Sequence, residues 1–151
     1  DTSVLTISKF GMAKRSRLGS GEMVPLLDEN GAQMLDEEGV GVTQRDGYRR
    51  TNRGTKGVRT MSLREEDYIV GVRQIPDLED QLFILTKTGM MIRMVSGQTK
   101  ETLGKVTKGT RIMELRSPDR TGYDDEIIFV ARLPAELVDS SDADEATFEE
   151  E

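Results

Sequence analysis

The chain contains no cysteine, no histidine and no tryptophan among its 151 residues. Without cysteine it has no disulfide, no thiolate nucleophile and no Cys-ligated zinc site. Without histidine it has no His-based catalytic triad, no His–metal site and no imidazole acid–base group. No apolar run approaches the ~20 residues of a membrane-spanning helix, so we expect no membrane partner. The most common catalytic and metal-binding chemistries are therefore excluded.

Aromatic residues are also scarce, at 5%, and apolar residues make up 35% of the chain. Both values are low for a compact domain, but they are too high for disorder throughout. The length suits one domain or two small repeats. Because the chain starts with Asp1 rather than Met, we expect it to be part of a longer protein.

The net charge of −7 is unevenly distributed along the chain. All 21 basic residues lie between Lys9 and Arg132, whereas 136–151 carries eight acidic residues and no basic one. This segment has few apolar residues, so it cannot offset the entropy of ordering itself. We expect 136–151 to be a disordered acidic tail.

Two further segments have charge of one sign. Segment 19–43 has six carboxylates and no basic residue, and 44–61 has six basic residues against Asp46 alone. Asn30-Gly31 and Glu38-Gly39 are turn signals, so we expect 19–43 to form a small hairpin inserted in the fold. Its carboxylate spacing matches no EF-hand loop, and we expect no metal site there.

The body of the chain repeats itself. Three pairs of segments recur in the same order: LTISKFGMAKR (5–15) with FILTKTGMMIR (83–93), TKGVRTM (55–61) with TKGTRIM (107–113), and DYIVGVR (67–73) with EIIFVAR (126–132). Their offsets are 78, 52 and 59 residues. Recurrence at this scale is typical of repeat architectures. We expect a first repeat over 1–76, with the insert 19–43, and a second over 77–135.

Each recurring segment has the pattern of β-structure. The apolar run 83–85, the turn residues up to Gly89 and the apolar stretch after it predict a hairpin. A helix over 78–95 is the alternative, but Thr86, Thr88 and Gly89 disfavour it. We expect further strands over 4–8, 58–63, 68–72, 110–115 and 127–131. About four antiparallel strands per repeat predict an all-β, propeller-like protein with two blades.

Searches for a catalytic or nucleotide site find little. A phosphate-binding loop needs four residues between its glycines and Ser or Thr after its Lys, whereas Gly97 and Gly104 are six residues apart and Val106 follows Lys105. Asp124 and Asp125 are adjacent, so in a strand they point to opposite faces. Tyr68 and Tyr123 are better explained by packing than by nucleophilic catalysis. We therefore assign no catalytic residue.

The basic stretch YRRTNRGTKGVR (48–59) is typical of a phosphate binder. Guanidinium groups grip phosphate oxygens, and closely spaced glycines let backbone N–H groups approach an anion. Its shorter echo is KVTKGTR (105–111). An ordinary solvated loop is the alternative. The candidate phosphate-binding residues are Lys14, Arg15, Arg49, Arg50, Arg53, Gly54, Lys56, Gly57, Arg59, Arg93, Lys105, Lys108 and Arg111.

These segments resemble the C-terminal domain of the A subunit of bacterial DNA gyrase over about 3–133. Repeats of that family run as a strand, a Thr-Lys-x-Gly-x-x-Lys/Arg hairpin, an Arg-Gly-x-Lys-Gly turn, an acidic turn and an apolar strand. The matching segments here are SKFGMAKR (8–15), TKTGMMIR (86–93), RGTKG (53–57) and DYIVGV (67–72). The acidic tail is also typical of the family.

The resemblance implies a β-pinwheel, a disc of blades that exchange strands, which wraps duplex DNA around a basic rim without reading bases. It also implies two protein partners, the gyrase B subunit together with the rest of the gyrase A subunit, in a cytoplasmic, bacterial type II topoisomerase. The ATPase, the Mg²⁺ site and the active-site tyrosine of that enzyme lie elsewhere, so this chain is expected to be non-catalytic and to hold no cofactor.

One departure keeps alternatives open. The hallmark box of the family is Gln-Arg-Arg-Gly-Gly-Arg/Lys-Gly. Residues 51–57 meet it at Arg53, Gly54, Lys56 and Gly57 but depart from it at the other three positions. We therefore expect later blades, with the box upstream. A propeller-like protein-interaction module and the related C-terminal domain of the topoisomerase IV A subunit remain alternatives.

Overall fold

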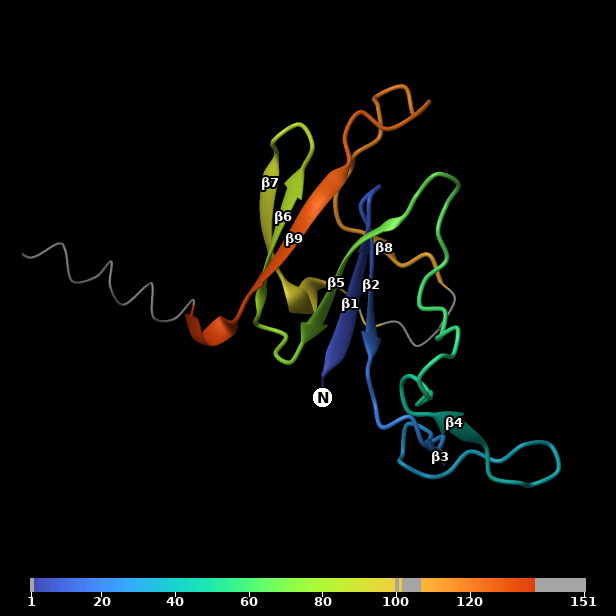
Figure 1. The fold of residues 1–151 in the computed structure, drawn as a ribbon. Helices are drawn as coiled ribbons and strands as arrows, with labels where there is room; N and C mark the ends of the chain where they lie inside the picture. The colour runs from blue at the N-terminus through green and yellow to red at the C-terminus, as the bar shows by residue number, and fades with distance from the viewer. Residues whose placement is uncertain (1, 100, 102–106, 138–151) are drawn as a thin grey trace, which may run out of the picture.

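The computed structural model describes residues 2–99, 101 and 107–137 (Figure 1). It is almost entirely β-structure, and every strand pair is antiparallel. The elements are β1 (Ser3–Ser8), β2 (Met12–Arg17), β3 (Met23–Pro25), β4 (Thr43–Arg45), β5 (Ile69–Ile75), β6 (Gln81–Thr86), β7 (Met91–Val95), the 3₁₀ turn η1 (Ser96–Gln98), β8 (Thr110–Arg111) and β9 (Ile127–Leu133). Within the described residues, no helix is long and apolar enough to cross a bilayer.

The strands form two equivalent blades and one small hairpin. The first sheet has the order β5-β1-β2-β8, the second has the order β7-β6-β9, and β3 pairs with β4 alone. The hairpin registers Ser3↔Arg17 and Gln81↔Val95 differ by 78 residues on both strands. The all-β architecture and the 78-residue offset of the hairpins are confirmed, and the alternative helix over 78–95 is excluded.

The third pair of recurring segments aligns one residue away from the predicted offset. Leu5 pairs with Arg73 in the first sheet, and Phe83 pairs with Ala131 in the second, so β5 and β9 are related by 58 residues rather than 59. The equivalence of Arg73 and Arg132 was therefore wrong. A one-residue slip moves every side chain of a strand to the other face, and sequence identity at one arginine could not detect it.

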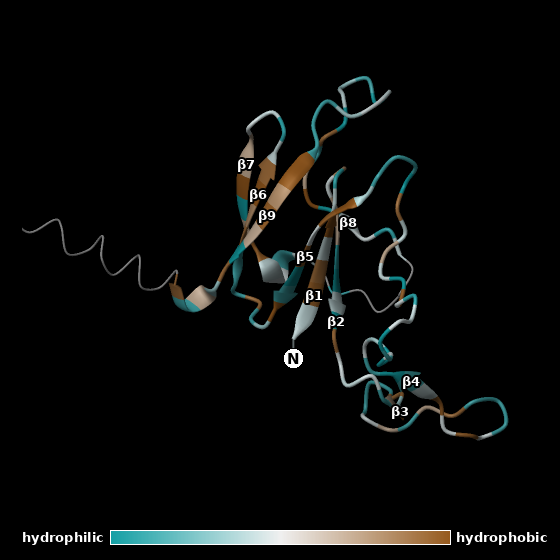
Figure 2. Cartoon of the chain, in the orientation of Figure 1, coloured by the Kyte–Doolittle hydropathy of each residue, from teal (hydrophilic) through white to brown (hydrophobic). Residues whose placement is uncertain are grey.

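The core lies where β1 and β6 carry their apolar side chains. In β6, Leu82, Ile84 and Thr86 are buried and alternate with partly exposed residues, as expected for a strand with one covered face. β1 is buried along nearly its whole length, because strands flank it on both sides. Gly71 of β5 lies against Val130 of β9, where an added Cβ would stand 3.1 Å from that side chain. Figure 2 shows the apolar residues concentrated on these strands.

β8 comes from the second repeat but completes the sheet of the first. Met12 and Ala13 of β2 pair with Arg111 and Thr110, and the Ile112 N–H donates to the Gly11 carbonyl at 2.9 Å. This is the strand exchange that the resemblance implies. The predicted strand over 110–115 is therefore much shorter than expected.

The predicted strand over 58–63 was wrong, because the structure has no strand there. A β-strand exists through its ladder hydrogen bonds, and among the described residues no strand pairs with this segment. The boundary between repeats at 76/77 stays a prediction. The tail beyond Leu137 lies outside the described residues.

The acidic insert forms a projecting arm, which we define as residues 20–46. β3 and β4 make its stem, which confirms the predicted hairpin. At the end of the stem three backbone bonds of 2.8–2.9 Å close a ring: Leu26 N–H donates to Val42, Met34 to Leu26, and Val42 to Met34. Two tight turns extend from this ring, each folded around an aspartate. The arm is thus a built structure that points away from the sheets (Figure 1).

Candidate nucleic-acid interface

The basic stretch 48–59 runs along the surface as an irregular segment. Its cations are all exposed: Arg49, Arg50, Arg53, Lys56 and Arg59. Gly54 and Gly57 have φ of 81° and 80°, a region that favours glycine, and no described atom lies within 4 Å of a Cβ built on either. The segment is therefore open to solvent on the side of these glycines.

The echo of this stretch lies beside it. The Ser62 N–H donates to the Thr107 carbonyl at 2.9 Å, which joins the end of the first basic segment to the start of the second. Lys108 and Arg111 are exposed, and Arg111 also pairs with Glu114 at 2.6 Å. Figure 1 shows both segments on the same side of the first sheet. Basic segments 45 or more residues apart in sequence thus form one surface.

The start of the basic segment is held by the root of the arm. The Tyr48 N–H donates to the Leu18 carbonyl at 3.0 Å, and the Arg50 Nε donates to the Ser20 carbonyl at 3.1 Å. The Tyr48 and Thr60 hydroxyls hydrogen-bond to each other and so tie the two ends of the segment together. The exposed cations between these anchors are carried on a loop with a defined course.

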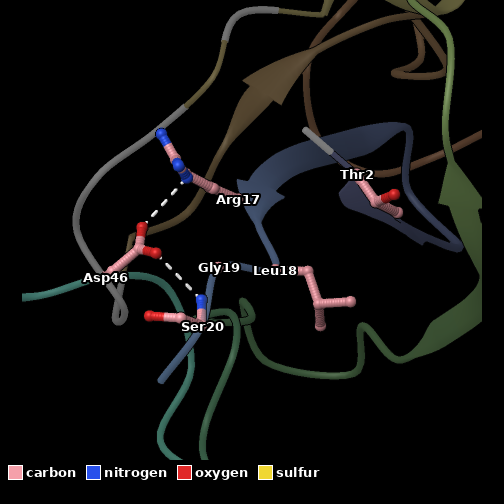
Figure 3. Close-up of a pocket in the computed structure, with 6 residues that line it drawn as sticks. All are labelled: Thr2, Arg17, Leu18, Gly19, Ser20 and Asp46. Carbon is pink, nitrogen blue, oxygen red and sulfur yellow. Dashed lines mark hydrogen bonds and ion pairs between the residues drawn. The ribbon is translucent and has the colours of Figure 1, made fainter. Parts of the chain in front are cut away.

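Asp46 organises that root, in a shallow depression shown in Figure 3. Its carboxylate accepts the Ser20 N–H at 2.9 Å and pairs with Arg17 Nε at 2.9 Å. The hydrogen bonds from Ser20, together with the charge of Arg17, lower the pKa of Asp46. Asp46 is therefore an anchoring group rather than a free acid beside the basic surface.

Lys14 and Arg15 lie inside the fold rather than on this surface. Lys14 is 1% exposed, and its Nζ donates to the Thr60 carbonyl at 2.6 Å, while burial lowers its pKa. Arg15 is 7% exposed and bonds to the Thr99 carbonyl at 2.8 Å and to Glu101 at 3.1 Å. Strand β2 is covered by β1 and β8 on its edges, so both cations hold segments together.

The remaining candidates are separated from the surface or undescribed. Arg93 is exposed on β7, where its Nε bonds to the Gln81 side chain and its guanidinium lies 5.9 Å from the Phe83 ring centre. Figure 1 shows β7 on the opposite side of the molecule from 48–59. Lys105 lies outside the described residues.

One group of cations was missed by sequence reasoning. Lys9 Nζ lies 4.5 Å from the ring centres of both Phe10 and Tyr68, and Phe10 stacks on Tyr123 with centres 3.8 Å apart. Arg116 approaches the same Tyr123 ring at 5.9 Å. Cation–π contacts of this kind depend on residues distant in sequence, so only the fold brings them together. The expectation that Tyr123 packs is confirmed.

The family model of the DNA gyrase C-terminal domain, described as a beta-propeller, matches residues 2–20, 42–76 and 80–134. The chain belongs to this family. The match covers both blades and both basic segments, and it omits 21–41, which is most of the arm.

Curated relatives agree with this assignment. The DNA gyrase A subunit of Kosmotoga olearia is 35% identical over 102 residues, which is 66% of this chain and 12% of that protein. The corresponding protein of Staphylococcus aureus is 29% identical over 135 residues, or 85% of this chain and 14% of that protein. The chain thus spans only a small part of the length of these relatives.

A solved structure of the C-terminal domain of DNA topoisomerase IV shares the fold. It superposes with a TM-score of 0.55 over 98% of this chain and 36% of that one, at 14% sequence identity. The likeness supports the arrangement of blades, and the low identity carries nothing further about function.

Proposed function

We propose that this chain is a DNA-binding part of a gyrase A subunit, which holds the duplex by its phosphate backbone and contributes to wrapping it. The observation that carries the proposal is the joined basic surface of 48–59 and 107–111. Seven exposed cations lie on it: Arg49, Arg50, Arg53, Lys56, Arg59, Lys108 and Arg111. Membership of the gyrase C-terminal family supports duplex DNA as the polyanion.

The chemistry of the surface favours phosphate contacts over base readout. Its cations lie on irregular segments, and the described structure has no α-helix beside them to enter a major groove. The open glycines Gly54 and Gly57 allow backbone N–H groups to approach a phosphate. Contacts to phosphates position a protein on DNA but carry no sequence information. We therefore propose binding that tolerates any sequence.

In the same proposal the chain works as one piece of a larger machine. The remainder of the A subunit, together with the B subunit, supplies strand passage, ATP and Mg²⁺ outside this chain, and the enzyme acts in the bacterial cytoplasm. The role of this piece is to hold one segment of the duplex. No catalytic step is assigned to its residues.

The test is the affinity of the 151-residue chain for plain duplex DNA as a function of salt. Each phosphate contact contributes about −0.9 to the slope of log K against log salt concentration, so the seven cations set a limit of about −6. Arg53→Ala and Lys56→Ala are each expected to weaken binding and to reduce the slope by about 1. The preference among duplexes of equal length should not change.

Arg120→Asn is a matched control for these variants. Arg120 is exposed in a turn outside both basic segments and has a φ of 59°, which Asn tolerates. It removes one positive charge without touching the proposed surface, and the slope should stay unchanged. A slope near zero for the parent chain, or equal losses in Arg53→Ala and Arg120→Asn, would refute the proposal.

A further inference from the structure

The joint between β2 and β8 is a close backbone contact that only glycine permits. Gly11, at the start of β2, has φ of 85°, and a Cβ on it would stand 2.6 Å from the Met113 carbonyl oxygen. Gly109, just before β8, has φ of 74°, and its Cβ would stand 2.3 Å from the Ala13 carbonyl oxygen. Each half of the joint is thus shaped to receive the other.

Both halves occur a second time in the same chain, and both are open. The equivalent of Gly11 is Gly89, with φ of 92°, and the equivalent of Gly109 is Gly57, with φ of 80°. No described atom lies within 4 Å of a Cβ built on either glycine. The chain therefore holds one completed joint and the two separate halves of another.

The outer edge of β7 is ready to accept a strand. The Thr86 N–H donates to the Met90 carbonyl at 2.9 Å, which makes Leu85↔Met91 a non-hydrogen-bonded pair within the β6–β7 hairpin. The N–H and C=O of Met91 consequently point away from β6, and among the described residues no strand pairs with that edge. The Met90 and Met91 side chains are 57% and 66% exposed, whereas Ala13, the equivalent of Met91, is fully buried.

The two open halves lie too far apart to meet within one molecule. Segment 55–61 is held beside β2, because Lys14 Nζ bonds to the Thr60 carbonyl. Figure 1 shows β7 on the other side of the sheets. A partner for each half must come from another molecule, and the same chain supplies both.

We propose that the β7 edge of one copy binds segment 57–60 of a second copy, as β2 binds β8. The register follows from the two offsets: Met90 pairs with Arg59, and Met91 with Val58. The contact is head to tail, since each copy presents one edge and one segment, so copies assemble into a ring or an open row. Strand addition at an exposed edge supplies the affinity through main-chain hydrogen bonds.

Two substitutions at one position test the hydrogen bonds of the edge. Met91→Pro removes the outward N–H and leaves the β6–β7 ladder intact, whereas Met91→Ala shortens the side chain and keeps the N–H. In sedimentation without DNA, we expect the mean mass of the parent chain and of Met91→Ala to rise with concentration to at least twice 16.9 kDa. Met91→Pro should remain at 16.9 kDa.

Cysteine pairs test the register, because the chain has no cysteine of its own. Met90 and Arg59 are equivalent to the non-hydrogen-bonded pair Met12↔Arg111, whose Cα atoms are expected within reach of a disulfide. Mixing Met90→Cys with Arg59→Cys under oxidation should give several-fold more cross-linked dimer than mixing Met90→Cys with Thr55→Cys. The latter pair is out of register by four residues, or about 13 Å.

Each result decides the matter. Concentration-dependent mass that Met91→Pro abolishes, with cross-linking confined to the predicted register, supports the head-to-tail contact. A parent chain that stays monomeric, equal masses for Met91→Pro and Met91→Ala, or equal cross-linking of both cysteine pairs would overturn it.

Discussion

Replacing two equivalent glycines by alanine should have very different effects on stability. Gly109 and Gly57 occupy the same position in the two repeats and have left-handed φ values of 74° and 80°. An alanine in this region costs roughly 1–2 kcal/mol, and this cost applies at both positions. Only Gly109 faces a close neighbour, the Ala13 carbonyl oxygen at 2.3 Å from the added Cβ.

The additional cost at Gly109 comes from separating β8 from β2. That shift weakens the bond from Ile112 N–H to the Gly11 carbonyl, at 2.9 Å, and the ladder bonds of the two paired residues. Losing two such bonds costs about 2 kcal/mol. We therefore expect Gly109→Ala to lower the free energy of unfolding by about 3–4 kcal/mol, and Gly57→Ala by about 1–2 kcal/mol.

Urea denaturation measures this difference directly. With a slope of about 2 kcal/mol per molar, the two midpoints should differ by about 1 M. The protein is kept dilute, so that contacts between copies do not contribute. Equal midpoints for the two variants would show that the β2–β8 joint adds nothing to stability, and would contradict the reasoning from close approach.

Three further predictions concern the turns and the arm. Burial acts to raise the pKa of Asp125, but hydrogen bonds from Thr86, Thr88 and the backbone outweigh it and lower the pKa to about 2. Its stabilising effect is thus present above about pH 4 and lost as the pH falls from about 4 to about 2, and Asp125→Asn should flatten the stability profile in that window. An unchanged acid limb would contradict this. In the arm, Asp36 Oδ1 accepts the Glu38 and Val40 N–H groups at 3.0 and 2.8 Å, so Asp36→Ala should speed proteolysis of the arm without moving the urea midpoint of the sheets; a lowered midpoint would mean that the arm supports the blades. Replacing 24–44 by Asn-Gly, which can close the Met23↔Arg45 pair, removes five carboxylates. It should leave the fold intact and tighten DNA binding more at low salt than at high salt, whereas a salt-independent change would exclude electrostatic repulsion.

The local pattern of the chain determined the hairpins. The alternation of apolar residues in 83–85, the threonines and Gly89 predicted β6, its turn and β7, because these residues encode a strand and a turn within a few positions. The 78-residue repeat placed β1 and β2 in the same way. The run of cations in 48–59 also predicted an exposed basic segment, since such a density of charge cannot be buried.

The sequence determined less where a residue depends on a distant partner. Segments 58–63 and 110–115 look alike in sequence, yet only the second contributes a strand, because only it finds β2 as a neighbour. Lys14 and Arg15 belong to a basic motif, but the addition of β1 and β8 to either side of β2 buries them. Burial is a property of the assembled sheet and leaves no mark on the residue itself.

The same distinction applies to the candidate surface. Charge along the chain predicted two basic segments, and the fold decided that Ser62 and Thr107 join them while Arg93 lies on the other side. The open glycines Gly57 and Gly89 carry the same information as Gly109 and Gly11 in sequence. Only the tertiary structure shows which pair has met, because a close approach exists only when both backbones are in place.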